Sequence, residues 1–282
     1  MIRLGLIGYP LGRSLSPQIH AAALKACGLE GDYSLFSIHP DDKQGLKDLL
    51  ARVRVGEIHG LNVTIPHKQN IILLLDKLTP TAQAIGAVNT IYLRDDKLIG
   101  DNTDASGFLA DLKNFLVGSP SPILGEGLGV RGKNAFILGA GGSARAVTFA
   151  LLNDGWNVTL AARRLEQAHQ LATSFASHDL CITDDISNIE LSNITLIVNT
   201  TPLGMNPNTD QSPWIEKLPF PNAAIYDLVY NPRETKLVRD ARSQGLPATT
   251  GLGMLIEQAA LAFEIWTGYD VSRETLRDAI DC

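Results

Sequence analysis

The segment from Gly139 to Ala144 (GAGGSA) has residue types and a spacing that could bind the phosphates of a dinucleotide. It matches the pattern G-x-G-x-x-A and directly follows an apolar, strand-like run, Asn134 to Leu138. Glycines let the backbone approach a pyrophosphate closely, and a helix predicted to begin near Ser143 would direct its free N–H groups at it. A purely structural tight turn is the alternative. The position between a strand and a helix favours dinucleotide binding.

Two arginines, Arg163 and Arg164, follow the second predicted strand of this unit, Asn157 to Ala162. Proteins that bind NAD usually place an acidic residue here, which contacts the ribose 2′-hydroxyl. Guanidinium groups gain little from a hydroxyl but pair well with the 2′-phosphate of NADP. The pair therefore predicts NADP, although both arginines, Arg164 in particular, could instead be solvated residues at the start of a helix.

A lysine follows a strand-like run in the segment from Gly60 to Lys68 (GLNVTIPHK). The two-residue period of a strand sends Asn62 and Thr64 to one side, near the carboxyl end where open α/β sheets bind ligands. Pro66 ends the strand and is predicted to open a helix, with Lys68 in its first turn. Lys68 there could act as a general acid or base, but an exposed surface lysine is the more usual interpretation.

Serines and acidic residues at predicted helix starts are weaker candidates. Ser16 is predicted to cap a helix whose first residue is Pro17, and Ser14 and Ser16 together could bind a carboxylate at the helix amino terminus. A well-capped helix alone explains the same residues. Asp104 resembles another helix cap, and Asp101 beside it competes for the same role.

The last third of the chain contains three further candidates for contact with a ligand: a loop, a tyrosine and one face of a predicted helix. The loop from Asn199 to Met205 (NTTPLGM) lies at the carboxyl end of a predicted strand, and Tyr230 follows the next strand, Ala224 to Val229. Gly251, Met254 and Gln258 are spaced for one face of a helix, which could contact both cofactor and substrate. Tyr230 and Met254 could instead be ordinary packing residues. The histidines have no metal-ligand spacing, so no metal is predicted.

Strand-like runs alternate with helical patterns along the whole chain, which predicts an α/β protein with parallel sheets and two domains. A stretch rich in Gly, Ser and Pro, Gly118 to Gly129, marks the boundary. We expect residues 1–117 with the helices of 252–282 to form one domain, and residues 118–251 to form a Rossmann-like domain. The strands expected in the first domain are Leu4 to Gly8, Tyr33 to Ile38, Gly60 to Thr64 and Val88 to Leu93. Its expected helices are Pro17 to Cys27, Asp41 to Arg54, His67 to Lys77 and Ala105 to Leu116.

Composition and charge favour a small-molecule partner in the cytoplasm. The net charge is −6 and no block of basic residues is present, which argues against nucleic-acid and anionic-lipid partners. The three cysteines are widely separated and form no C-x-x-C pair, so no disulfide framework is expected. The apolar run Ile71 to Leu75 is too short to cross a bilayer.

Taken together, seven segments in this order resemble the shikimate dehydrogenase family. They are Ser14 to Pro17, Asn62 to Lys68, Gly86 to Thr90, Gly100 to Asp104, Gly139 to Gly142, Asn199 to Pro202 and Gly251 to Leu255. The resemblance covers essentially the whole chain. It implies reversible reduction of 3-dehydroshikimate to shikimate by NADPH, in the pathway toward aromatic amino acids, by a monomer or homodimer.

The resemblance also implies roles for individual residues. The catalytic pair would be Lys68 and Asp104, and the serines that bind the substrate carboxylate would be Ser14 and Ser16. The ring-hydroxyl ligands would be Asn62, Thr64, Asn89, Asp104, Tyr230 and Gln258. The cofactor would be bound by Gly139, Ala140, Gly141, Gly142, Ser143, Ala144, Arg163, Arg164, Thr201, Leu228, Gly251 and Met254.

The chain departs from the family pattern after the second strand of the Rossmann-like domain. The family commonly has Asn-Arg-Thr there, whereas this chain has Ala162, Arg163 and Arg164, with Gln167 where another basic residue often follows. The strength of the NADP preference is therefore left open. A quinate/shikimate dehydrogenase that uses NAD and a non-catalytic dinucleotide sensor are the alternative functions.

Overall fold

The chain folds into two compact units, unit 1 (Met1–Gly107 with Ile256–Cys282) and unit 2 (Phe108–Leu255). The computed structural model describes residues 1–12, 14–118, 132–175, 180–186 and 190–281. Apart from Gly118, the predicted connection Gly118 to Gly129 lies outside these residues. The chain passes between the units within α4 (Asp104–Gly118) and α9 (Leu252–Thr267). The predicted boundaries were placed at the ends of these helices, whereas the units divide inside them.

Unit 1 is built on a six-stranded mixed sheet with the order β2-β1-β3-β5-β6-β4. Its strands are β1 (Ile2–Gly8), β2 (Gly31–Ser37), β3 (Gly60–Val63), β4 (Lys77–Leu78), β5 (Thr90–Arg94) and β6 (Lys97–Asp101). Strand β1 pairs in parallel with β2 and β3, whereas β5 is antiparallel to both β3 and β6. Parallel pairing puts the carboxyl ends of β1 and β3 at the same sheet edge, where ligands bind in open α/β sheets.

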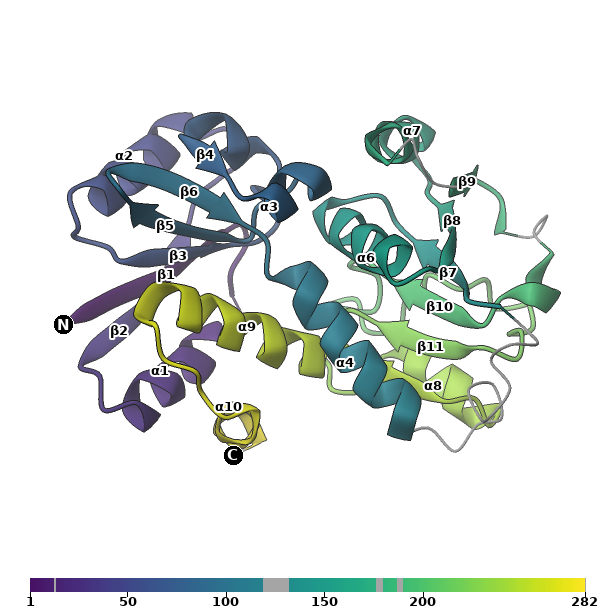
Figure 1. Cartoon of the computed structure of the whole chain (residues 1–282). Helices are drawn as coiled ribbons and strands as arrows, with labels where there is room; N and C mark the ends of the chain where they lie inside the picture. Colours follow the sequence, from purple (N-terminus) through teal and green to yellow (C-terminus); the bar gives the residue numbers. More distant parts are fainter. Residues whose placement is uncertain (13, 119–131, 176–179, 187–189, 282) are drawn as a thin grey trace. The chain divides into compact units, whose positions relative to one another are not determined.

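Helices cover both faces of this sheet (Figure 1). They are α1 (Ser16–Ala26), α2 (Lys43–Arg54), η1 (Asn70–Leu74), α3 (Pro80–Ile85), the unit 1 part of α9, and α10 (Arg273–Asp281). On the α2 side, Leu46, Leu50 and Val53 pack into a core with Leu61 and other buried strand residues. The return of the C-terminal helices to unit 1 agrees with the predicted fold class.

Two predictions for unit 1 were wrong, because sheet pairing outweighed local signals. Residues 67–77 form turns, the short helix η1 and the strand β4 rather than one α-helix. The Asp76 N–H donates to Leu98 O, and β4 pairs with β6, so this segment is drawn into the sheet. The β5–β6 hairpin makes this sheet mixed rather than parallel. Its turn holds Asp95 and Asp96 at positive φ without the glycine that usually signals such a turn.

Unit 2 contains a fully parallel six-stranded sheet with the order β12-β11-β10-β7-β8-β9. Its strands are β7 (Asn134–Leu138), β8 (Asn157–Ala161), β9 (Leu180–Thr183), β10 (Leu196–Asn199), β11 (Ala224–Asp227) and β12 (Ala248–Thr250). Its helices are α6 (Gly142–Asn153), α7 (Leu165–Ser174), η3 (Leu191–Asn193) and α8 (Lys236–Ser243), besides parts of α4 and α9. The strand order reverses between β7 and β10, as in a Rossmann fold, and this reversal is where such sheets bind ligands.

Neither a membrane span nor a metal cluster is found in the described part of the chain. None of its helices is long and apolar enough to cross a bilayer. Within the same residues, no three His, Cys, Asp or Glu side chains are grouped so that they could hold a metal ion.

Candidate active site

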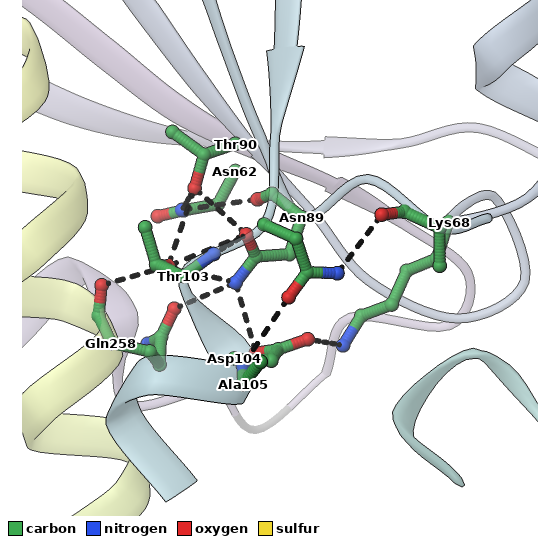
Figure 2. Close-up of polar contacts among 10 residues, drawn as sticks. Asn62, Lys68, Asn89, Thr90, Thr103, Asp104, Ala105 and Gln258 are labelled. Carbon is green, nitrogen blue, oxygen red and sulfur yellow. Dashed lines mark hydrogen bonds and ion pairs between the residues drawn. The ribbon is translucent and has the colours of Figure 1, made fainter. Parts of the chain in front are cut away.

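Lys68 and Asp104 form a buried ion pair in unit 1 (Figure 2). Lys68 Nζ lies 2.6 Å from Asp104 Oδ2, and the two side chains are only 11% and 6% exposed. Lys68 lies in the turns that follow β3, and Asp104 is the first residue of α4. The fold thus brings together two charged groups that are 36 positions apart in the sequence.

Asn89 connects this ion pair to its neighbours (Figure 2). Its Nδ2 lies within hydrogen-bond distance of Asp104 Oδ1 and Thr103 Oγ1, both at 2.9 Å, and of Gln258 Oε1 at 3.4 Å. Its Oδ1 accepts from the Thr103 N–H at 2.8 Å and the Thr90 hydroxyl at 2.9 Å. Asn89 is buried, so its amide can hold Asp104 in one orientation.

Asn62 joins the same group of polar side chains from β3. Its Nδ2 donates to Asn89 O at 3.2 Å, and the Tyr33 hydroxyl donates to its Oδ1 at 2.8 Å. The imidazole of His20 stacks on the Tyr33 ring with 4.4 Å between centroids. Burial lowers the pKa of His20 to about 3, with the nearby Asn62 opposing the shift. His20 is therefore uncharged at neutral pH and acts here as an aromatic packing partner.

Ser14, Ser16 and Thr64 lie on the segments that leave β1 and β3. Thr64 follows β3 directly, and its N–H donates to Ile7 O at 2.8 Å. Ser16 was predicted to be the cap of α1, but Leu15 holds that position and Ser16 is the first helical residue. The Ser14 hydroxyl, two residues earlier, accepts the Ser16 N–H at 3.2 Å.

The two acidic residues that competed at the start of α4 have different partners. One oxygen of Asp101 accepts from the Thr79 hydroxyl at 2.6 Å and from the Asn102 N–H at 2.7 Å. Asp104 instead faces Lys68. Asp101 is thus a structural residue at the end of β6, and Asp104 is the acidic residue of the candidate site.

The predicted phosphate-binding turn in unit 2 is a strand–turn–helix. Gly139 follows β7 with φ of +114°, and a Cβ on it would lie 2.5 Å from Thr200 Oγ1, so only glycine fits there. Gly141 occupies the cap position of α6, and a Cβ on it would meet nothing within 4 Å. Ala144 is fully buried. The open backbone before the twelve-residue helix α6 has the features that suit a bound pyrophosphate.

Arg163 and Arg164 are both exposed in the segment between β8 and α7. Arg164 occupies the cap position of α7 and makes no side-chain capping bond. Both guanidinium groups are therefore accessible to a ligand at the carboxyl end of β8.

The remaining candidates from the last third of the chain divide between the units. Thr201, Leu228, Tyr230, Gly251 and Met254 belong to unit 2, whereas Gln258 belongs to unit 1. A Cβ on Gly251 would lie 2.4 Å from Leu228 O, so this glycine permits a close backbone contact. Met254 is 7% exposed, and burial raises the pKa of Tyr230.

Several residues that support the site were not found from the sequence. Thr103 lies inside the Gly100 to Asp104 motif and could have been identified by its position there. Thr90 likewise ends the Gly86 to Thr90 motif, whereas Tyr33 and His20 carry no local signal, because each contributes through a contact made by the tertiary fold.

We predict that Lys68→Met and Asp104→Asn will be strongly non-additive in their effects on the free energy of unfolding. Each single change leaves a buried group without its partner, whereas the double variant leaves neither charge behind. The coupling free energy from urea denaturation should be about 1–3 kcal/mol. The exposed pair Arg52 and Glu57 serves as the control, with an expected coupling below about 1 kcal/mol. If the effects of the two substitutions on the free energy of unfolding were additive, Lys68 and Asp104 would not interact as a buried ion pair.

Comparison with known proteins places this arrangement in one family. Residues 6–91 match the model of the shikimate dehydrogenase substrate binding domain, and residues 251–280 match the shikimate 5'-dehydrogenase C-terminal domain. A shikimate dehydrogenase (NADP(+)) of Methanocaldococcus jannaschii is 40% identical, over 98% of this chain and 95% of that protein.

Solved structures agree over the full length. The shikimate 5-dehydrogenase of Thermus thermophilus, in complex with NADP(H) and shikimate, is 37% identical with a TM-score of 0.84, over 100% of this chain and 99% of that one. A ligand-free 5-ketofructose reductase of a Gluconobacter species is 29% identical with a TM-score of 0.81, over 99% and 98% of the two chains. Because the curated relative exceeds 30% identity over nearly the whole chain, this chain belongs to the shikimate dehydrogenase family.

Proposed function

We propose that this chain catalyses the reversible reduction of 3-dehydroshikimate to shikimate with NADPH, in the pathway toward aromatic amino acids. The observation that carries the proposal is the buried pair of Lys68 and Asp104, surrounded by amide and hydroxyl groups. Such a site offers both a proton and hydrogen bonds to a polyhydroxylated ring. The family relationship supplies the substrate and the cofactor.

Lys68 and Asp104 have distinct tasks in this reaction. NADPH, when bound, supplies the hydride that is added to the ring carbonyl carbon. The Lys68 ammonium gives a proton to the carbonyl oxygen, so that no alkoxide is left without a compensating charge in a site with little water. Asp104 holds the ammonium in place and can accept a hydrogen bond from a neighbouring ring hydroxyl. In the oxidation direction the neutral Lys68 amine accepts the hydroxyl proton.

The proposed substrate ligands are those implied by the family motifs. Ser14 and Ser16 would bind the carboxylate at the start of α1. The ring hydroxyls would contact a set of polar side chains, namely Asn62, Thr64, Asn89, Asp104, Tyr230 and Gln258. The burial of Asn62, Asn89 and Asp104, and their mutual hydrogen bonds, support fixed positions for these groups.

Unit 2 would hold NADP. The turn from Gly139 to Ala144 fits a pyrophosphate, because Gly141 has open space beside it and α6 begins at Gly142. Arg163 and Arg164 are exposed and would pair with the 2′-phosphate. Thr201, Leu228, Gly251 and Met254 would contact the rest of the cofactor. Unit 1 would accordingly be the substrate-binding and catalytic domain, in a cytoplasmic monomer or homodimer.

A test of the proton role is Lys68→Ala, which should lower kcat by about 100-fold or more while KM for shikimate changes much less. The reason is that the variant loses the proton donor but keeps the hydrogen-bonding side chains. Reduction of NADP followed by absorbance with shikimate measures both constants. Lys77→Ala, which changes an exposed lysine of β4, is the control and should leave both constants unchanged. Turnover by Lys68→Ala near that of the parent would rule out this role.

The cofactor assignment predicts that Arg163→Ala raises KM for NADP about 10- to 100-fold and changes KM for NAD by less than about threefold. Losing charge-assisted hydrogen bonds to a phosphate has this magnitude, and NAD lacks the 2′-phosphate. Assays of shikimate and quinate with each cofactor complete the experiment. A preference for quinate and NAD would favour the alternative dehydrogenase, and no turnover with any pair would favour a non-catalytic sensor.

A further inference from the structure

Two buried polar residues of unit 2, Asn199 and Asp227, have no part in the function proposed above. They end the adjacent parallel strands β10 and β11 and lie in register with each other. Both are 0% exposed. Asn199 Nδ2 donates to Asp227 Oδ1 at 2.8 Å, at the edge of the sheet where the predicted cofactor loops leave it.

Asp227 determines how the Asn199 amide is oriented. Besides Asn199, the carboxylate accepts the Val229 N–H at 3.0 Å and the Thr235 hydroxyl at 2.6 Å. Burial raises its pKa to about 6, while these three donors oppose the shift and stabilise the ionised form. An ionised carboxylate can only accept hydrogen bonds. Asn199 must therefore turn its Nδ2 toward Asp227 and its Oδ1 the other way.

The oxygen that is turned away holds Thr201. Asn199 Oδ1 accepts from the Thr201 N–H at 2.9 Å and from the Thr201 hydroxyl at 2.8 Å. The Thr201 hydroxyl in turn accepts the Leu203 N–H at 3.3 Å. The Asn199 side-chain amide thus fixes the positions of both the backbone and the side chain of Thr201, in the loop after β10.

Close contacts also link this pair to three further residues of the proposed cofactor set, namely Leu228, Gly251 and Gly139. The Leu228 N–H donates to Asn199 O at 2.9 Å, and the carbonyl of Leu228 lies against Gly251. A Cβ on Gly139 would lie 3.1 Å from Thr201 Cγ2, so the loop packs directly on the first glycine of the phosphate-binding turn. A shift of Asn199 would therefore also displace Leu228, Gly251 and Gly139.

We propose that Asn199 and Asp227 are positioning residues for the cofactor, which hold Thr201, Leu228 and Gly139 in the arrangement that binds NADP. This inference rests on the proposed function, because it assumes that unit 2 binds NADP. The pair itself is closed to solvent and would not touch the cofactor. Its effect would be on cofactor affinity and not on the proton transfer in unit 1.

The test compares Asn199→Ala with Thr235→Val. Asn199→Ala releases Thr201, and it should raise the Kd for NADP, measured by titration calorimetry, about tenfold or more, as expected for losing buried hydrogen bonds. KM for shikimate at saturating NADP should change by less than about twofold. Thr235→Val also removes a hydrogen bond to Asp227, but it leaves every bond of Asn199 in place. Its Kd for NADP should stay within about twofold of the parent.

Three outcomes would overturn the inference. A folded Asn199→Ala variant that binds NADP as tightly as the parent would remove the positioning role, and equal weakening by Thr235→Val would show general destabilisation instead. A parent protein that binds no NADP would refute the proposed function together with the inference, whereas the first two outcomes leave that function intact.

If Asn199→Ala does not fold, Asn199→Asp keeps the size but sets two carboxylates against each other. It should weaken NADP binding in the same way, and unchanged binding would count against the pair.

Discussion

The structure of unit 1 depends on placing a positive and a negative charge 2.6 Å apart with little access to water. Removing both charges from water is costly, and their attraction offsets that cost only when the remaining polar atoms also have partners. Asp104 meets this condition through Asn89, which occupies its second oxygen. Asn89 must then be held as well, and Thr90 and Thr103 hold it. The buried charge pair thus explains why so many neighbouring polar residues are buried with it.

The same arrangement of buried polar groups occurs in both units. In each, a buried amide next to a carboxylate fixes the local geometry. Asn89 does this for Asp104, and Asn199 does it for Asp227. An amide suits this place because it donates on one side and accepts on the other, so that one acidic neighbour determines its orientation. A site built in this way has little freedom to rearrange, which is what orienting a small ligand requires.

The sequence predicted those features that depend on neighbouring residues. The glycine turn after β7 and the helix α9 follow from local patterns, and both were found as expected. The segment after Pro66 was predicted to be a helix, but pairing of β4 with β6 over a distance in the chain decided its structure. Lys68 and Asp104 were matched only through family motifs, since nothing in the spacing of residues 36 apart shows that they meet. Tyr33, which orients Asn62 from another strand, could not be predicted for the same reason.

The most direct test of the central claim is a crystal structure of the chain with shikimate and NADP bound. The account predicts that Lys68 Nζ lies within hydrogen-bond distance, about 3.2 Å or less, of the ring oxygen that is oxidised, while Asp104 still contacts the ammonium. A bound shikimate whose reacting oxygen is out of reach of Lys68, or is bonded to a different acid or base, would contradict the assignment of this pair.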